Sequence, residues 1–344
     1  MKKVAVIGQY GEGPDYTTGQ AVKTYFTVQW LMRRFGRDQV VIVNTYGWKK
    51  QPVRLFLSLV RAMAGCKNAV IFPAQHGVKV FPMAVSALNR VFHRRTFFVV
   101  IGGWLADFLK DHAAIRRATA SFDGVCAETE SLVEQLKAVG VKNAWHLPNC
   151  RDYLAAPEKH VSGTLPLKVC TYSRVTESKG IADAADICRK ANELLGQRAF
   201  QLEVYGPVAP EYKEAFGQLC AREEENLRYC GVRNASEAAS VLNSQFALPF
   251  PTYYEGECFA GTALDAFQSR TPIIANDWKY NSEVIIDGDN GFLYPFRDTD
   301  AAARDLAALY RDPKLYAHIQ EGCEHSARRY DSDAVLERLA SKMA

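Results

Sequence analysis

Short apolar segments typical of β-strands alternate with helical patterns along this chain, and this alternation constrains the fold most. The first half contains six such segments, at residues 4–8, 40–45, 69–73, 96–102, 124–127 and 144–147. Helical patterns separate several of them, for example at 20–35 and 129–139. Strand–helix–strand repeats place strands parallel with helices on both faces, so the pattern predicts a Rossmann-like α/β domain.

The alternation stops and then begins again, which divides the chain. A polar stretch follows Pro148 and Asn149, and new strand-like segments come at 167–172, 201–205, 246–250 and 272–275. A length of 344 residues also favours two domains. We therefore predict two Rossmann-like domains facing a central cleft, at 1–150 and 151–330. We expect a C-terminal helix, at about 331–344, to pack back on the first domain.

Composition is that of an ordinary globular protein, with 48% hydrophobic and 23% charged residues. No apolar run reaches the roughly 18 residues that a membrane-spanning helix needs. The nine cysteines are scattered and form no C-x-x-C, which argues against a zinc site and for a reducing compartment. A strand-like segment begins at residue 4 with no signal peptide before it, so we expect a cytoplasmic protein.

Charge is distributed unevenly between the two halves. Residues 1–150 hold 20 Lys+Arg against 9 Asp+Glu, and the remainder holds 22 against 29, giving net charges of +11 and −7. Much of the excess alternates with apolar residues: Lys49, Lys50, Arg54, Arg61, Arg90, Arg94 and Arg95. For residues 49–64 the pattern favours a helix that packs on the core with solvated arginines. The alternative is a helix lying on an anionic membrane surface.

The most informative local motif is the stretch 253–266, YYEGECFAGTALDA. Its small residues at 260–262 mark the point where a loop turns into a helix. A helix start exposes unpaired N–H groups and a partial positive charge, which suits an anionic ligand. Glu257 precedes this start and Asp265 follows Gly261 by one turn, so both acids are placed to accept hydrogen bonds from sugar hydroxyls. The alternative is an acidic helix start without a function.

A second motif lies in the strand-to-helix loop 173–180, SRVTESKG. Arg174 and Lys179 project from this one loop at the carboxyl edge of a sheet, where ligands of α/β folds bind. Two fixed cations can neutralise a diphosphate leaving group without a metal ion. The alternative is a pair of solvated surface cations.

Together these motifs resemble those of family 4 retaining glycosyltransferases, which have the GT-B fold. Glu257-x7-Asp265 is similar to the family's E-x7-E signature, with Asp in place of the second Glu, and Arg174-x4-Lys179 is similar to its donor-phosphate pair. The resemblance implies that Glu257 lies beside the transferred sugar and that Asp265 binds the ribose. It further implies donor contacts from Gly19, Gly206, Val232, Arg233, Cys258, Phe259, Ala260, Gly261 and Thr262.

The resemblance also draws attention to two positions in the first half. Many relatives carry a histidine close to the reacting sugar where this chain has Gly103. His76, at the end of the preceding strand, is the candidate to enter the cleft instead; a purely structural histidine is the alternative.

A dinucleotide-binding interpretation is less compatible with the residues. The first strand ends in Gly8-x-x-Gly11-x-Gly13, an order that differs from G-x-G-x-x-G. The second strand ends at Asn44, where that fingerprint has an acid. The sequence therefore argues against a dehydrogenase.

The resemblance implies an enzyme that moves a hexose from a nucleotide-diphosphate sugar, most simply a UDP-sugar, to a glycan or polyprenyl-pyrophosphate-linked acceptor with retention. The expected setting is cell-surface polysaccharide synthesis, such as capsule or O-antigen, at the inner face of the membrane. No cofactor, metal motif or nucleic-acid partner is expected. Two alternatives stay open: a sugar-nucleotide epimerase of the same fold, and a catalytically silent partner of another transferase.

Overall fold

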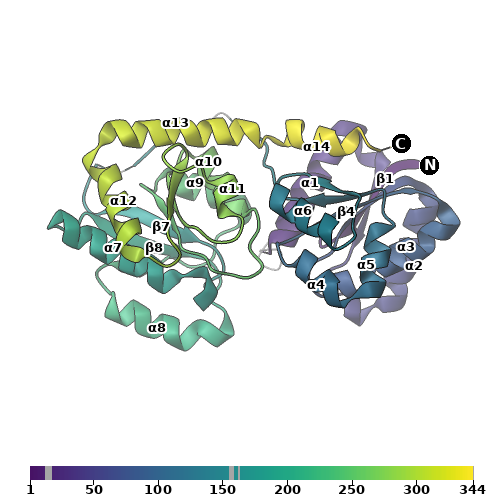
Figure 1. Ribbon diagram of the computed structural model, residues 1–344, viewed down its shortest axis with the longest axis horizontal. Coiled ribbons are helices and arrows are strands. Elements are labelled where there is room, and N and C mark those ends of the chain that lie inside the picture. Colours follow the sequence, from purple (N-terminus) through teal and green to yellow (C-terminus); the bar gives the residue numbers. More distant parts are fainter. Residues whose placement is uncertain (12–17, 155–158, 162, 344) are drawn as a thin grey trace. The chain divides into compact units, whose positions relative to one another are not determined.

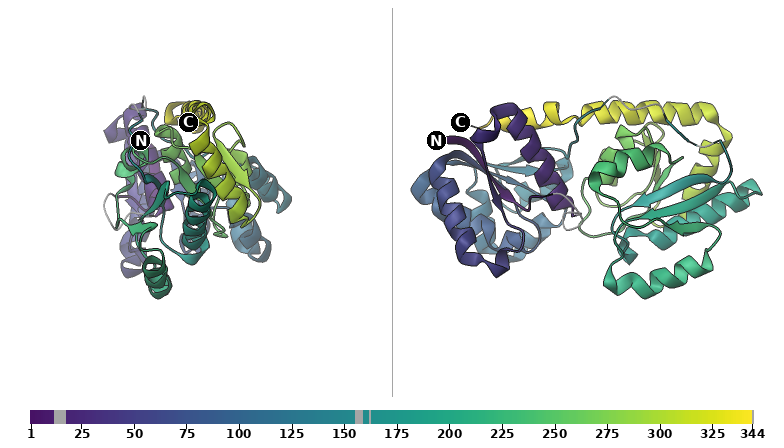
Figure 2. Two further views of the ribbon diagram at one scale, coloured as in Figure 1. Left: turned by 90° about the vertical axis from the view of Figure 1, so that its left-hand side faces the viewer. Right: turned by 180° about the vertical axis from the view of Figure 1, so that it is seen from behind.

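The computed structural model describes residues 1–11, 18–154, 159–161 and 163–343. Contacts divide the chain into two compact units, Met1–Cys150 with Ser332–Ala344, and Arg151–Asp331. Each unit holds parallel strands with helices on both sides (Figures 1 and 2). The predicted α/β class is confirmed.

The first unit is built on one parallel six-stranded sheet of order β2-β1-β3-β4-β5-β6. Its central strands are apolar on both faces, as expected for a sheet covered on both sides. The order reverses between β1 and β3, so loops after these strands diverge at the carboxyl edge. The strands are β1 (Lys2–Gly8), β2 (Val40–Asn44), β3 (Cys66–Phe72), β4 (Arg95–Val99), β5 (Gly124–Ala127) and β6 (Ala144–His146).

The helices of the first unit cover both faces of this sheet. The chain crosses from β1 to β2 and then back to β3, so right-handed connections place α1 and α2 on opposite faces. The helices are α1 (Gly19–Phe35), α2 (Pro52–Gly65), α3 (Phe81–Phe92), α4 (Leu105–Asp111), α5 (Ala113–Ala120), α6 (Glu130–Ala138) and α14 (Ser332–Ala340).

The C-terminal helix α14 packs beside α1. Leu336 and Leu339 share a buried cluster with Leu31 of α1 and with strand residues beneath it. Trp30 donates its indole N–H to Asp333 at 2.6 Å, and Arg34 pairs with Glu337 at 2.8 Å. Residues 332–344 are thus part of the first unit although they end the sequence.

Helix α2 differs from the expected core-packing helix. Only Leu59, Ala62 and Met63 are buried, all in its C-terminal half. In its N-terminal half Val53, Phe56 and Leu57 are 71%, 52% and 47% exposed, which is unusual for side chains of this size. The sequence pattern misjudged this half because apolar periodicity does not reveal whether a partner surface is present.

The second unit contains two three-stranded parallel sheets, β7-β8-β9 and β10-β11-β12. A parallel bridge between Val169 and Ala247 places them side by side, with β7 next to β10. The combined order is that of a doubly wound sheet whose direction reverses between β7 and β10. The strands are β7 (Leu167–Tyr172), β8 (Phe200–Tyr205), β9 (Leu227–Tyr229), β10 (Leu248–Phe250), β11 (Ile273–Asn276) and β12 (Gly291–Tyr294).

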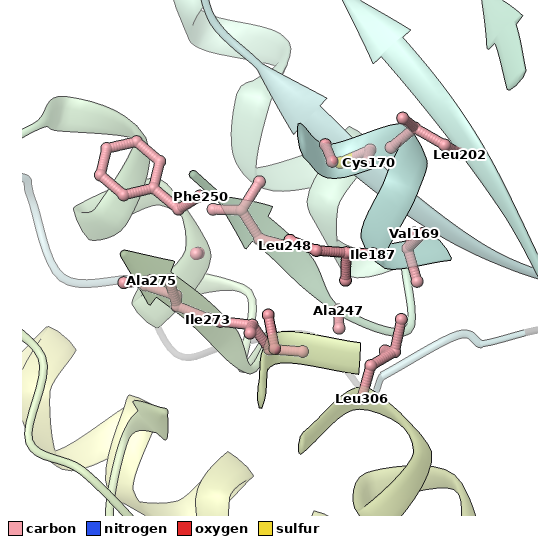
Figure 3. Close-up of a cluster of buried hydrophobic side chains, with 14 of the residues drawn as sticks. Val169, Cys170, Ile187, Leu202, Ala247, Leu248, Phe250, Ile273, Ala275 and Leu306 are labelled. Atoms are coloured by element: carbon pink, nitrogen blue, oxygen red, sulfur yellow. The ribbon is translucent and has the colours of Figure 1, made fainter. Parts of the chain in front are cut away.

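The helices of the second unit enclose this sheet around a large apolar core. Figure 3 shows its centre, where Ile187 of α7 and Leu306 of α12 meet strand residues such as Leu248. Helices α7 and α12 lie side by side (Figure 1). The helices are α7 (Ile181–Leu195), α8 (Lys213–Arg222), α9 (Ala238–Asn243), α10 (Gly261–Gln268), α11 (Asn281–Val284), α12 (Thr299–Arg311) and α13 (Pro313–Arg329).

Candidate active site

The candidate site lies in the second unit, where the loops after β7 and β10 meet at the reversal of strand order. Tyr253 of the second loop donates its backbone N–H to the carbonyl of Ser178 in the first, at 2.8 Å. Gly180 has φ +69°, and a side chain there would overlap the carbonyl oxygen of Pro251. Glycine is therefore required at 180 by backbone conformation and by the close approach of the two loops.

The structure brings Lys179 and Glu257 together as a direct ion pair, which spacing alone could not reveal. Both side chains are largely buried, at 17% and 10% exposure. Thr252 donates its hydroxyl to the same carboxylate oxygen, Glu257 Oε2, at 2.9 Å. The Lys179 ammonium also lies 5.1 Å from the ring centre of Tyr254. Glu257 is therefore held in one orientation, with a cation beside it.

Arg174 lies on the same loop as Lys179 but has a different environment. Its side chain is exposed, and among the described residues it has no hydrogen-bond or ion-pair partner. The loop that carries it is fixed, because Val175 donates its backbone N–H to Pro207 at 2.9 Å. An unpaired guanidinium on a fixed loop is available to an anion from solvent.

Helix α10 begins at Gly261 beside these residues. No side chain caps its start at Ala260, so its first N–H groups stay available to a ligand. Thr262 donates its hydroxyl to the carbonyl of Tyr172, at the end of β7, at 2.8 Å, and this bond ties the start of α10 to the Arg174 loop. Cys258 and Phe259 are both 4% exposed, so their side chains belong to the core and any ligand contact must come from their backbone.

Asp265 does not stand free at this site. Its Oδ1 accepts a hydrogen bond from Arg151 Nε at 2.9 Å, and the two side chains are 12% and 10% exposed. Burial raises the pKa of the Asp265 carboxyl above its ordinary value, while the Arg151 guanidinium opposes that rise. Sequence reasoning missed Arg151. The one available signal was Asp in place of the family's Glu, because a shorter acid leaves room for a large partner.

Three other predicted residues lie in the loops that follow β8 and β9. Gly206 has φ +136°, and a side chain there would overlap the carbonyl oxygen of Ser173. Val232 and Arg233 follow β9 and are exposed. Tyr172 donates its phenol to the carbonyl of Asn234 at 2.8 Å. Burial raises the pKa of this phenol, the charge of Asp265 raises it further and that of Arg233 lowers it.

The remaining predicted residues, Gly19, His76 and Gly103, belong to the first unit. Gly19 is the first residue of α1, with open space around it; His76 is exposed in the loop after β3, and Gly103 is buried after β4. All three follow strands at the carboxyl edge, and their roles stay predictions. Of the glycine-rich segment after β1, Gly13 lies outside the described residues.

Three Asp-x-Asp triplets, at 287–289, 298–300 and 331–333, were overlooked by the expectation of no metal motif. In each, the first carboxylate accepts a hydrogen bond from a backbone N–H: Asp287 from Leu293, Asp298 from Ala301 and Asp331 from Tyr153, at 2.9, 3.0 and 2.9 Å. These carboxylates have local structural partners, and the expectation of a metal-independent site stays a prediction.

Comparison with known proteins agrees with the geometry just described. Residues 155–325, which carry both loops and α10, match the model of the family "Glycosyl transferases group 1". This part of the chain belongs to the family. In the described part of the chain, no helix is both long and apolar enough to cross a membrane.

Individual curated relatives match shorter stretches of this chain at low identity. The phosphatidyl-myo-inositol mannosyltransferase of Mycolicibacterium smegmatis is 29% identical over 129 residues, which are 38% of this chain and 32% of that protein. The capsular polysaccharide biosynthesis glycosyltransferase CapM of Staphylococcus aureus is 24% identical over 111 residues, 32% of this chain and 29% of CapM. The chain thus matches about a third of the length of these curated relatives.

Whole-chain similarity is found at the level of structure. Anabaena HepE, solved in complex with UDP and glucose, superposes with a TM-score of 0.74 over 99% of both chains, at 13% sequence identity. At this identity the similarity shows the fold alone, and it confirms the predicted GT-B architecture.

Proposed function

We propose that this protein is a retaining glycosyltransferase that moves a hexose from a nucleotide-diphosphate sugar to a glycan or lipid-linked saccharide. The observation that supports the proposal most is the convergence of Arg174, Lys179 and the start of α10 on one loop edge, with Glu257 fixed beside them. Positive groups arranged around an open helix start suit a diphosphate, and a held carboxylate suits sugar hydroxyls.

In the proposed reaction the bond between the anomeric carbon and the diphosphate oxygen breaks, and the acceptor hydroxyl oxygen forms the new bond on the same face. The acceptor proton passes to the departing phosphate oxygen, so that charge and atoms balance. Arg174 and Lys179 donate to that oxygen and its neighbours as negative charge develops, the type of stabilisation that preorganised donors supply. Lys179 exchanges part of its contact with Glu257 for the phosphate.

Glu257 then has a defined task in the bound complex. Thr252 keeps donating to Oε2, so the carboxylate keeps its orientation when Lys179 turns toward phosphate. Its remaining acceptor capacity is directed to hydroxyls of the hexose. This arrangement positions the sugar without a covalent nucleophile.

The names of relatives support a polysaccharide setting, since CapM acts in capsular polysaccharide biosynthesis by its name. A UDP-sugar is our first choice of donor because HepE has been solved with UDP and glucose. No metal ion is needed in this scheme, because Arg174 and Lys179 supply the charges that would otherwise come from one.

The proposed acceptor side is a membrane-bound saccharide, and helix α2 supports it. Val53, Phe56 and Leu57 are exposed on its N-terminal half, next to exposed Lys49 and Lys50. Apolar side chains framed by lysines match an anionic lipid surface, to which each basic residue contributes about 1 kcal/mol. Arg94 and Arg95 of the predicted basic cluster donate to the backbone carbonyls of Met63 and Lys342 at 2.9 Å, so the proposal relies on Lys49 and Lys50.

The test is a panel of UDP-, GDP- and dTDP-sugars, scored first by thermal stabilisation and then by release of the nucleotide with saccharide acceptors. A ligand at 100 times its Kd adds roughly 2.7 kcal/mol of stability. Nucleotide release that requires an acceptor supports the transferase. Conversion of the donor without an acceptor would point to the epimerase, and binding without any turnover to a silent partner protein.

A further inference from the structure

The pairing of Asp265 with Arg151 changes the interpretation of both residues. Arg151 is the first residue of the second unit, and its backbone is fixed by a bond from its N–H to the Tyr330 carbonyl at 3.2 Å. Its side chain is 10% exposed, so a cation has been taken largely out of water. Such burial is costly, and a buried cation is tolerated where it has a charged partner, which Asp265 supplies here.

The guanidinium extends past Asp265 to the start of α10. A Cβ added at Gly261 would overlap the Nη2 nitrogen of Arg151, so that nitrogen lies against the first residue of the helix. The φ angle of Gly261 is not positive, so the backbone conformation does not require glycine at this position. Helix propensity does not favour it either, because glycine is about 1 kcal/mol less favourable than alanine in a helix. The space that glycine leaves is the space that the guanidinium occupies.

This placement sets like charges beside one another. The open start of α10 carries a partial positive charge, Arg151 adds a full one, and Thr262 ties the same turn to the Arg174 loop. Asp265 offsets one cation of the group. An anion that enters beside the helix start would be stabilised by the charge of Arg151 and by the partial charge of the helix together.

Resting on the function proposed above, we infer that Arg151 is a third cation of the diphosphate site and that Asp265 acts by holding Arg151, not by binding ribose. Nε is anchored by the carboxylate, and Nη2 is directed to the α10 start, where a phosphate oxygen would accept from it together with the free N–H groups. Arg151 is thus a ligand-binding residue and Asp265 a positioning residue.

Two variants separate this assignment from a structural role. Arg151→Met combined with Asp265→Asn removes both charges together, so that neither is left buried alone. Gly261→Ala keeps every charge and places a methyl group against Nη2, so the end of Arg151 must shift away from the helix start. Arg222→Met is the matched control, because Arg222 pairs with Glu223 at the end of α8.

The measurement is calorimetric binding of UDP and GDP, each compared with its 2′-deoxy counterpart. We expect the double variant to bind the diphosphates about 10- to 100-fold more weakly, the loss of one charge-assisted hydrogen bond, with Arg222→Met unchanged. Gly261→Ala should weaken binding more in the wild-type background than in the double variant. The preference for UDP over 2′-deoxy-UDP should be the same in the wild type and in Asp265→Asn.

The outcomes also separate this inference from the proposed function. Wild-type affinity in the double variant, or a 2′-hydroxyl preference that vanishes in Asp265→Asn, would overturn the role of Arg151 and leave the transferase proposal standing. Absence of diphosphate binding by the wild type, or binding that Arg174→Ala leaves unchanged, would refute the donor site itself.

Discussion

Lys159 offers a sharp test of the energetics of the second unit. It is largely buried, and its ammonium donates to the Leu242 carbonyl at 2.9 Å and to the Thr271 hydroxyl at 2.6 Å, both neutral groups. Burial lowers the pKa of Lys159 from 10.5 to about 7, with the nearby thiols of Cys323 and Cys170 opposing the change. Lys159→Met should therefore remove a pH dependence that the wild type possesses.

The sign follows from proton binding. Between pH 7 and 10.5 the unfolded chain keeps the proton on Lys159 and the folded chain has lost it, so the free energy of unfolding rises with pH. A pKa lowered to about 7 corresponds to about 2 kcal/mol of that rise between pH 7 and pH 9. Methionine cannot titrate. Thr271 still donates to the Leu242 carbonyl at 2.8 Å, so the substitution leaves no buried acceptor unpaired there.

The assay is urea unfolding at pH 7, 8 and 9 for the wild type, Lys159→Met and the exposed control Lys314→Met. The variant should be the more stable protein at pH 7, and its advantage should shrink by about 2 kcal/mol by pH 9. The difference in unfolding free energy between the variant and the wild type at each pH cancels the contribution of other groups that titrate in this range. If the free energy of unfolding changes with pH equally in the wild type and in Lys159→Met, the reasoning is refuted.

Three further predictions concern the proposed function. Arg174→Ala and Lys179→Ala should each lower kcat by about 10²–10³-fold in transferase assays while the protein stays folded, and near wild-type rates would contradict the diphosphate assignment. Arg174→Ala should leave melting unchanged, whereas Lys179→Ala should lower it, because Glu257 loses its buried partner. Activity should survive exhaustive EDTA treatment, whereas strict dependence on Mn²⁺ or Mg²⁺ would show that the diphosphate is held differently. Binding to anionic vesicles should weaken as salt rises, and it should also weaken in the double variant Phe56→Ser/Leu57→Ser. The comparably exposed control Leu194→Ser should bind as the wild type does. Equal partitioning to neutral and anionic vesicles would contradict the proposed lipid partner.

Sequence reasoning found Arg174, Lys179 and Glu257 because each lies in a local signature of strand, loop and helix. It could not find the Lys179–Glu257 ion pair, since the two residues are 78 positions apart. Arg151 and Asp265 are separated by 114 positions, and nothing near Arg151 marks it as functional. Long-range pairing depends on how the strands are ordered, which local patterns do not encode.

The fold itself was predicted better than its details. Parallel strands alternating with helices gave the correct class for both units. The strands β9 and β12 were not predicted, because only one of the three residues of β9 is buried and β12 begins with glycine. The exposure of Phe56 and Leu57 was also beyond reach, because a helical pattern does not specify what covers it.

The contact of Gly206 with the Ser173 carbonyl bears on how this site can evolve. Neither partner can be exchanged by substitution, since one is a main-chain oxygen and the other a position that accepts no side chain. Insertions in either loop would separate the two backbones and carry Arg174 away with them. If the proposed donor site is correct, we therefore expect new nucleotide preferences to arise at neighbouring exposed positions such as Val232 and Arg233, where side chains can change without altering the backbone. A mutant library aimed at altered donor choice should be concentrated there.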